Sequence, residues 1–324
     1  MHAFELVHPT DLPEAIDLLR ASPDSRLIAG GTDLVPMMRI GVQEPSRLVS
    51  LREIEGLDRI ALRDRILEIG ALARLADLES HPLIVDHVPM LAEAIAQAAS
   101  PQVRSAATLG GSLCQESRCW YYRGPFHCWL KGGELCYAEH GDHRRHALFG
   151  GGPCITVHPS DTAVVLSCLD ACVTVAGARG SREMPLSEFF ALPTPRHRAL
   201  TILEQGEIVT AVRIPLGGAE SRGIFVKAMD RAAFDFALVS VAALVRFDGT
   251  RVSEARIALG GVAPIPWRAC ESERALIGHS LDDPAIDRAA AAAVDGARPL
   301  SMNAYKIPLT RALVRRALAG LAPR

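Results

Sequence analysis

Hydrophobic and polar positions in the first hundred residues follow helical and strand periods in turn, which predicts short helices and strands that alternate along the chain. Apolar residues at helical spacing predict helices near Leu12 to Ala21, Leu34 to Ile40 and Met90 to Ala99, and another near Leu75. Short apolar runs predict strands at Arg26 to Ala29, Leu48 to Leu51 and Ile66 to Gly70. This alternation is typical of a mixed domain.

The same two periods return after Asp161. They predict helices at Thr162 to Leu169 and Leu186 to Phe190, a hairpin that begins at Cys172 to Ala176, and a strand at Ile208 to Ile214. Residues 217–221, which are small or glycine with one glutamate, indicate a linker. Strands at Gly223 to Asp230, Phe236 to Phe247 and Val252 to Leu259 follow, and then helices at Ala269 to Ile277, Pro284 to Val294 and Asn303 to Leu318. We expect an α+β fold with a first domain of residues 1–218 and a module of residues 223–324, a three-stranded sheet with helices.

Two glycine pairs interrupt the first domain. Gly30 and Gly31 follow a predicted strand and open a helix, and Gly110 and Gly111 come 80 residues later. Glycine lets backbone N–H groups approach an anion because it has no Cβ, so such a turn can cradle a pyrophosphate. The alternative is an ordinary tight turn with Thr32 or Asp33 as the helix N-cap. Two turns of this kind suit a dinucleotide, although the GxGxxG spacing of a Rossmann site is absent.

The stretch between Thr108 and Asp161 follows neither period. Residues 113–153 contain seven of the sixteen aromatic residues and seven of the 26 glycines, and five of the eight cysteines (Cys114, Cys119, Cys128, Cys136 and Cys154) lie between Thr108 and Asp161. An aperiodic segment of this length needs an internal staple to be ordered, and sulfur is the obvious candidate.

Composition narrows the function classes. The 324 residues are 49% hydrophobic, and the formal net charge of -2 comes without a run of like charge, so neither a nucleic-acid partner nor a membrane partner is indicated. The N-terminus lacks the features of a signal peptide and no apolar run is long enough for a membrane span, so we expect a cytoplasmic protein, with export on a partner's signal left open. In the cytoplasm, cysteines are more often thiols or metal ligands than disulfides.

Six motifs give the chain a resemblance to a known family: LIAGGTDL (27–34), ATLGGS (107–112), HPSD (158–161), EIVTAVRIP (207–215), FVKAMDRAAFDFALVSVAA (225–243) and ALGGVAPIPWR (258–268). Nearly end to end, the chain resembles the flavoprotein (medium) subunit of the molybdenum hydroxylase or xanthine dehydrogenase family. The resemblance implies a two-part FAD-binding domain of the PCMH type, followed by a small α+β domain of the CO dehydrogenase flavoprotein type.

By motif, the resemblance assigns the FAD-binding positions. It places the pyrophosphate on Ile28, Ala29, Gly30, Gly31, Thr32, Asp33 and Leu34, and on Thr108, Leu109, Gly110, Gly111 and Ser112, with Ala98, Gln115, Asp161, Val209 and Lys227 around the rest of the cofactor. Ser112 stands where relatives often have Asn, so a side-chain hydrogen bond to the cofactor would be shorter or absent. For Lys227, the alternative to a cofactor role is a strand lysine whose ammonium reaches water.

Forty-eight residues separate Ser112 from Asp161, far more than in most members of the family. This insertion, residues 113–157, resembles the cysteine-containing insertion of 4-hydroxybenzoyl-CoA reductase beta subunits and of the flavin subunits of bacterial aldehyde oxidoreductases, and the long final gap between cysteines favours the aldehyde type. The resemblance implies a [4Fe-4S] cluster on Cys119, Cys128, Cys136 and Cys154, with Cys114 as the nearest competitor. Cys168, Cys172 and Cys270 are interpreted as structural thiols. Structural zinc is the alternative, but it usually draws on cysteine pairs two to four residues apart, which the insertion lacks.

The resemblance also implies a role in electron transfer without a catalytic residue of its own. The partners would be a large molybdenum-cofactor subunit and a small subunit with two [2Fe-2S] clusters, in a heterotrimer with an external electron acceptor or donor. A subunit of a 4-hydroxybenzoyl-CoA reductase-like enzyme and, from a different class, a free-standing flavin oxidase are the alternatives.

Overall fold

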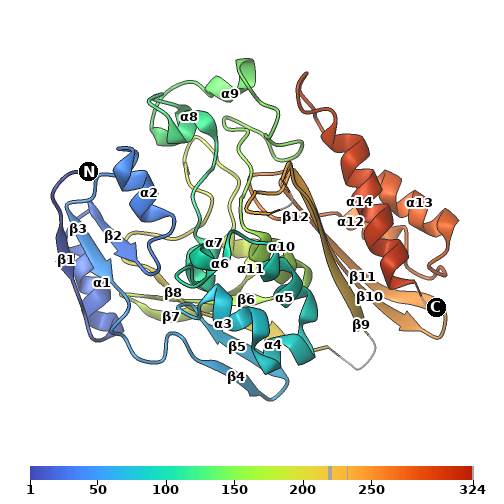
Figure 1. The fold of residues 1–324 in the computed structure, drawn as a ribbon, viewed down its shortest axis with the longest axis horizontal. Coiled ribbons are helices and arrows are strands. Elements are labelled where there is room, and N and C mark those ends of the chain that lie inside the picture. The colour runs from blue at the N-terminus through green and yellow to red at the C-terminus, as the bar shows by residue number, and fades with distance from the viewer. Residues whose placement is uncertain (218–220, 232, 323–324) are drawn as a thin grey trace.

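The computed structural model describes residues 1–217, 221–231 and 233–322 and contains three β-sheets that follow one another across the molecule (Figure 1). Residues 218–220 of the predicted linker lie outside this description. Within the described ranges, each helix is too short or too polar to cross a membrane.

The first sheet is parallel and has the order β1-β3-β2. Its strands are β1 (Glu5–Val7), β2 (Ser25–Ile28) and β3 (Arg47–Ser50), and the helices α1 (Leu12–Arg20) and α2 (Leu34–Arg39) accompany them. Asp11 caps α1 by accepting a hydrogen bond from the Glu14 N–H. The predicted elements of this region are present, and β1 is an addition to them.

The second sheet is antiparallel with the order β4-β5-β8-β6-β7. Its strands are β4 (Ile60–Arg63), β5 (Ile66–Gly70), β6 (Cys172–Gly177), β7 (Gly180–Pro185) and β8 (Ile208–Pro215). The helices that join the main core with this sheet are α3 (Leu75–Ser80), α4 (Pro82–His87), α5 (Pro89–Ala96), α7 (Leu109–Leu113), α10 (Asp161–Cys168) and α11 (Leu186–Phe189), and α6 (Pro101–Arg104) precedes α7. The predicted helix at Met90 to Ala99 therefore ends earlier, at Ala96, because Ala99 adopts a left-handed φ of 51° and Pro101 begins α6.

Helix α10 is buried on nearly every side. Seven of its eight residues are buried, because the helix packs against α5 and α7 of the first domain and against β10 and β11 of the C-terminal module. It begins at Asp161, with the Ser160 side chain as its N-cap. This end of α10 is therefore placed where the two parts of the chain meet.

The C-terminal sheet is antiparallel with the order β12-β11-β10-β9. Its strands are β9 (Ser221–Ala228), β10 (Val239–Asp248), β11 (Arg251–Gly260) and β12 (Trp267–Arg268), and the helices α12 (Cys270–Arg274), α13 (Asp283–Ala292) and α14 (Lys306–Leu321) close the core on it. The sheet has a fourth strand, β12, in addition to the three predicted. The predicted strand at Phe236 to Phe247 begins only at Val239, and the predicted helix at Asn303 to Leu318 begins and ends three residues later.

The insertion contains three short helices, α8 (Trp120–Arg123), the 3-10 helix η1 (Trp129–Lys131) and α9 (Tyr137–His140). In Figure 1 it extends upward from the centre of the molecule, between the N-terminal sheet and the C-terminal module. Tyr122 and Cys128 form a small separate core with Met37 of α2. The insertion is thus packed onto the helix that follows the first glycine pair.

Candidate functional site

The first glycine pair forms part of the wall of a cavity, which we call the glycine cavity. All seven residues from Ile28 to Leu34 line it. Gly31 has a φ of 71°, which a side chain would strain. A Cβ on Gly30 would lie 1.9 Å from the carbonyl oxygen of Ala106, so the backbone passes too close for any other residue. These two glycines are therefore required by the shape of the loop.

The second glycine pair lines the same cavity, together with Thr108 and Val209. Gly110 and Gly111 are part of helix α7, and not a loop turn as the sequence suggested. The Gly111 N–H donates to Thr108 Oγ1, the N-cap, at 3.2 Å. A Cβ on Gly110 would lie 2.8 Å from the Cβ of Ala71, whereas a Cβ on Gly111 would meet Thr108 Oγ1 at 2.9 Å. Both glycine motifs thus converge on one space.

Asp33 connects the glycine cavity to the insertion. Asp33 occupies the N-cap position of α2, as the alternative expected, but within the described chain its side chain makes no capping hydrogen bond to that helix. Asp33 Oδ1 instead lies 2.7 Å from Arg118 Nη2 and 2.8 Å from Arg123 Nη2, and Oδ2 accepts from the Glu116 N–H at 3.0 Å. Two insertion arginines therefore hold this carboxylate beside the cavity.

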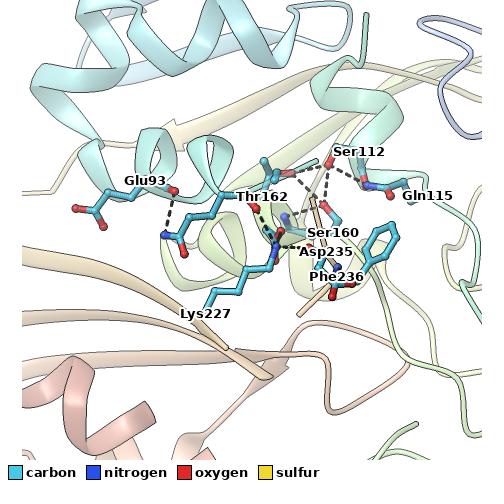
Figure 2. A network of polar contacts seen from close by, with 12 residues as sticks. Glu93, Ser112, Gln115, Ser160, Thr162, Lys227, Asp235 and Phe236 are labelled. Carbon is cyan, nitrogen blue, oxygen red and sulfur yellow. Dashed lines mark hydrogen bonds and ion pairs between the residues drawn. The ribbon is translucent and has the colours of Figure 1, made fainter. Parts of the chain in front are cut away.

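Ser112 turns its hydroxyl away from the glycine cavity and into the protein. Figure 2 shows it in a buried network with the hydroxyls of Ser160 and Thr162, each 2.9 Å from Ser112 Oγ. The Gln115 side-chain amide also donates to Ser112 Oγ at 3.3 Å. In this chain the serine therefore ties the end of α7 to the start of α10.

Asp161 and Lys227 form a buried ion pair with Lys227 Nζ 2.7 Å from Asp161 Oδ2. The lysine side chain is 0% exposed, so the alternative in which its ammonium reaches water is wrong. Its remaining hydrogen bonds go to the carbonyls of Gln97 and Asp235, each at 2.9 Å. Burial raises the pKa of Asp161, and the neighbouring Lys227 acts in the opposite direction. The pair joins β9 to the start of α10.

A second cavity, which we call the interdomain cavity, lies where the HPSD motif, the insertion and the C-terminal module meet. Asp161 lines it, and so do Arg118, His146 and Ser240. Each of the last three has a buried polar atom without a hydrogen-bond partner among the described residues, namely Arg118 Nε, His146 Nδ1 and Ser240 Oγ. Unsatisfied buried polar atoms are rare in proteins. Their concentration at this cavity indicates a place that is completed by a polar ligand.

The four cysteines assigned to the cluster line one small space, which we call the cysteine cavity: Cys119, Cys128, Cys136 and Cys154. Tyr121, Tyr122 and Trp129 of the insertion contribute aromatic walls. The neighbouring Cys154 thiol lowers the pKa of Cys136, which favours the thiolate form of this side chain. Among the described residues, no group of three or more His, Cys, Asp or Glu side chains is arranged to hold a metal ion.

The other four cysteines lie elsewhere. Cys114 lines the glycine cavity and is exposed. Cys168 is fully buried in the main core, Cys172 lies on β6, and Cys270 is exposed at the start of α12. Cys114, the nearest competitor for a ligand position, therefore lies at the glycine cavity and not at the cysteine cavity.

Several of the positions that the resemblance assigns to FAD do not line either cavity. Of the described residues that the resemblance assigns to FAD, Ala98, Leu109, Ser112, Gln115 and Lys227 are outside the walls of both cavities. Leu109 is fully buried, and the Ala98 carbonyl accepts a hydrogen bond from Arg104 at 3.0 Å. Sequence analysis missed Arg118 and His146. The sequence places both residues in the insertion, but it does not show that they lie beside the motif residues in space.

Comparison with known proteins identifies the family. Residues 2–217 match the model of the FAD binding domain in molybdopterin dehydrogenase, and residues 224–321 match the CO dehydrogenase flavoprotein C-terminal domain. The chain belongs to the FAD-binding medium subunits of the molybdenum hydroxylase family. It is thus an oxidoreductase subunit, and its fold is the PCMH-type FAD-binding domain followed by the flavoprotein C-terminal domain, as expected.

Relatives match over almost the whole chain. The aldehyde oxidoreductase FAD-binding subunit PaoB of Escherichia coli is 36% identical over 98% of both chains, and the carbon monoxide dehydrogenase medium chain of Hydrogenophaga pseudoflava is 30% identical over 97% of this chain and 96% of its own. The crystal structure of quinoline 2-oxidoreductase from Pseudomonas putida 86 has a chain with a TM-score of 0.78 at 28% identity, covering 99% of this chain and 97% of that one.

The buried pair of Asp161 and Lys227 gives a first prediction. Lys227→Met leaves the Asp161 carboxylate without its partner in a dry environment, so we expect a loss of about 3–5 kcal/mol in unfolding free energy. Adding Asp161→Asn removes the orphaned charge, so the double variant should be more stable than Lys227→Met alone. Urea unfolding of the cofactor-free chain measures both. A double variant no more stable than Lys227→Met would contradict a role for the unpaired Asp161 charge. The control is Lys131→Met, which removes a lysine for which no ion pair is found among the described residues.

Proposed function

We propose that the chain holds FAD across the glycine cavity and the interdomain cavity and a [4Fe-4S] cluster in the cysteine cavity, and passes electrons between its partner subunits and an external acceptor or donor. One observation carries the proposal: Cys119 lines both the interdomain cavity and the cysteine cavity. The proposed ring site and the proposed cluster site therefore share a wall. The proposed division into residues 1–218 and 223–324 puts the ring at the boundary of the two domains.

The glycine cavity suits the FAD pyrophosphate. The assigned positions in its wall are Ile28 to Leu34, Thr108, Gly110, Gly111 and Val209, with Asp161 in the wall of the interdomain cavity. Two glycine motifs in the wall of one cavity leave room for phosphates near backbone N–H groups. The unsatisfied polar atoms of Arg118, His146 and Ser240 support the placement of the polar flavin ring in the interdomain cavity.

The cysteine cavity suits an iron-sulfur cluster better than zinc. Structural zinc usually draws on cysteine pairs two to four residues apart, and the insertion lacks such a pair. A cubane is larger and takes one thiolate from each of several loops. Cys119, Cys128, Cys136 and Cys154 lie at the ends of separate short helices or loops, and the aromatic walls limit access of water.

When bound, the cluster exchanges single electrons and the flavin exchanges one or two. The protein's own contribution is to hold the two sites close together, to exclude water around the sulfurs, and to keep Asp161 and Lys227 beside the ring site. The similarity to an aldehyde oxidoreductase subunit favours a complex that oxidises aldehydes. A 4-hydroxybenzoyl-CoA reductase-like complex is the alternative within the family.

Gly111 provides a test of the FAD site. Gly111→Val would project its side chain beside Thr108 Oγ1 and into the glycine cavity, so we expect near-complete loss of FAD with retention of the fold. The control is Gly320→Val, a helical glycine in α14 whose Cβ would meet only the flexible end of Ile224 at 3.1 Å. Absorption of released flavin, with circular dichroism for the fold, measures the outcome. Full flavin content in Gly111→Val would contradict this site.

The cluster ligands predict the metal content. Anaerobically purified complex should contain about four irons per chain beyond those of the small subunit. The Cys119→Ser variant should lose these irons. The Cys270→Ser variant, at an exposed cysteine, and the Cys114→Ser variant, at a cysteine of the glycine cavity, should keep them. Iron and zinc analysis with electron paramagnetic resonance measures the result. Stoichiometric zinc without extra iron would exclude the cluster.

The proposed partners can be tested directly. The tagged chain should co-purify with a large molybdenum-cofactor subunit and a small subunit with two [2Fe-2S] clusters, because electron transfer needs a donor or acceptor on each side. Native mass spectrometry of the purified complex measures the composition. A monodisperse isolated chain that oxidises a small alcohol or amine by itself would favour a free-standing flavin oxidase instead.

A further inference from the structure

His146 lies between the two proposed cofactor sites. Its ring Nε2 is 3.1 Å from the Sγ of Cys119. The residue is 4% exposed and lines the interdomain cavity, and Cys119 lines that cavity as well as the cysteine cavity. Of the four proposed ligands, the one that His146 contacts is therefore the one that reaches the ring site.

The direction of this hydrogen bond follows from the proposed ligand state of Cys119. A cysteine binds a cluster as its thiolate, which carries no hydrogen. Its sulfur can then only accept, so the hydrogen of this contact lies on His146 Nε2. His146 Nδ1, which has no hydrogen-bond partner among the described residues, is left to face the interdomain cavity.

The main chain of His146 is held firmly. Its carbonyl accepts a hydrogen bond from the fully buried Lys306 Nζ at 3.1 Å and another from Asn303 Nδ2 at 3.3 Å. Lys306 Nζ also donates to the carbonyl of Gly261 at 2.7 Å, so α14, the end of β11 and the insertion meet at this point. A ring anchored in this way needs little reorganisation to contact the sulfur.

We propose that His146 is a positioning residue for Cys119, whose sulfur accepts its Nε2–H, and that this bond raises the reduction potential of the cluster at the ligand nearest the flavin ring. The inference rests on the cluster of the proposed function. A cluster gains negative charge on reduction, and a hydrogen bond to a ligand sulfur stabilises that charge. Fixing the Cys119 sulfur beside the interdomain cavity also keeps the electron-transfer distance between the proposed cluster and the proposed flavin ring short.

The test uses the purified complex with all its subunits. His146→Leu removes the donor, and His146→Gln keeps a side-chain N–H. The matched control is His143→Leu, because His143 is a buried histidine of the same loop whose ring contacts the Ala138 carbonyl and accepts from the Met302 N–H, and not a cysteine. The measurements are iron per chain and the midpoint potentials of cluster and flavin, from redox titration followed by electron paramagnetic resonance and absorption.

We expect His146→Leu to keep its iron and to shift the cluster potential downward, while His146→Gln restores it in part and His143→Leu leaves it unchanged. The flavin potential should stay the same in His143→Leu, because His143 lies outside the wall of the interdomain cavity. An unshifted cluster in His146→Leu, or an equal shift in His143→Leu, would overturn the inference and leave the cluster itself in place. A wild-type complex without iron beyond that of the small subunit would overturn the proposed function as well.

If His146→Leu loses its iron, a second measurement decides. Wild-type complex labelled with 15N-histidine and then reduced should show a weakly coupled histidine nitrogen at this cluster in pulsed electron paramagnetic resonance, and His146→Gln should lack it. Absence of that coupling in the wild-type complex would overturn the hydrogen bond.

Discussion

The buried contact of Lys227 with Asp161 is the constraint on which the arrangement of the molecule depends. It brings a strand of the C-terminal module against the first residue of α10, the helix that is enclosed by both parts of the chain. A charge without a partner at this depth would be costly, so the two parts are kept in one relative position. The interdomain cavity lies directly beside this pair, because Asp161 is in its wall. The interdomain cavity, where we propose the flavin ring, is thus lined by one partner of the contact that joins the two parts of the chain.

The insertion is attached to this frame at both of its ends and at several points between them, among them the contacts of Arg198 with its main chain and of Lys306 with the His146 carbonyl. The hydroxyls of Ser112 and Ser160 meet at 2.9 Å although 47 residues separate them in sequence, so the insertion leaves and returns at neighbouring points. Extra length in a loop with fixed ends costs little, since the entropy of closure grows slowly with length. Asp33 then binds Arg118 and Arg123, so the position of the insertion depends on the glycine loop. The insertion and the glycine cavity are therefore joined through the Asp33 side chain.

Periodic elements were predictable, and positions that depend on contacts were not. The strands near β8 and β11 and the helices near α1 and α10 follow from their apolar periods. Short elements such as β1 and β12 contain too few residues to show a period. Helix α7 was missed because glycines are poor helix formers, and only the Thr108 cap and the packing of Gly110 on Ala71 explain it. The motif residues around the glycine cavity came from a resemblance, whereas the aperiodic insertion gave no indication that Arg118 and His146 line the interdomain cavity.

The unsatisfied polar atoms explain why the insertion and the C-terminal module belong to one site. Arg118 and His146 come from the insertion and Ser240 from β10, yet all three line the same cavity and each has a buried polar atom without a partner in the described chain. A fold selected for stability alone would satisfy these atoms or replace them with apolar groups. Their concentration at one place fits a cavity that takes a polar ligand. The insertion thus contributes to the wall of the interdomain cavity as well as carrying the cysteines, which would bring the proposed cluster beside the proposed flavin ring.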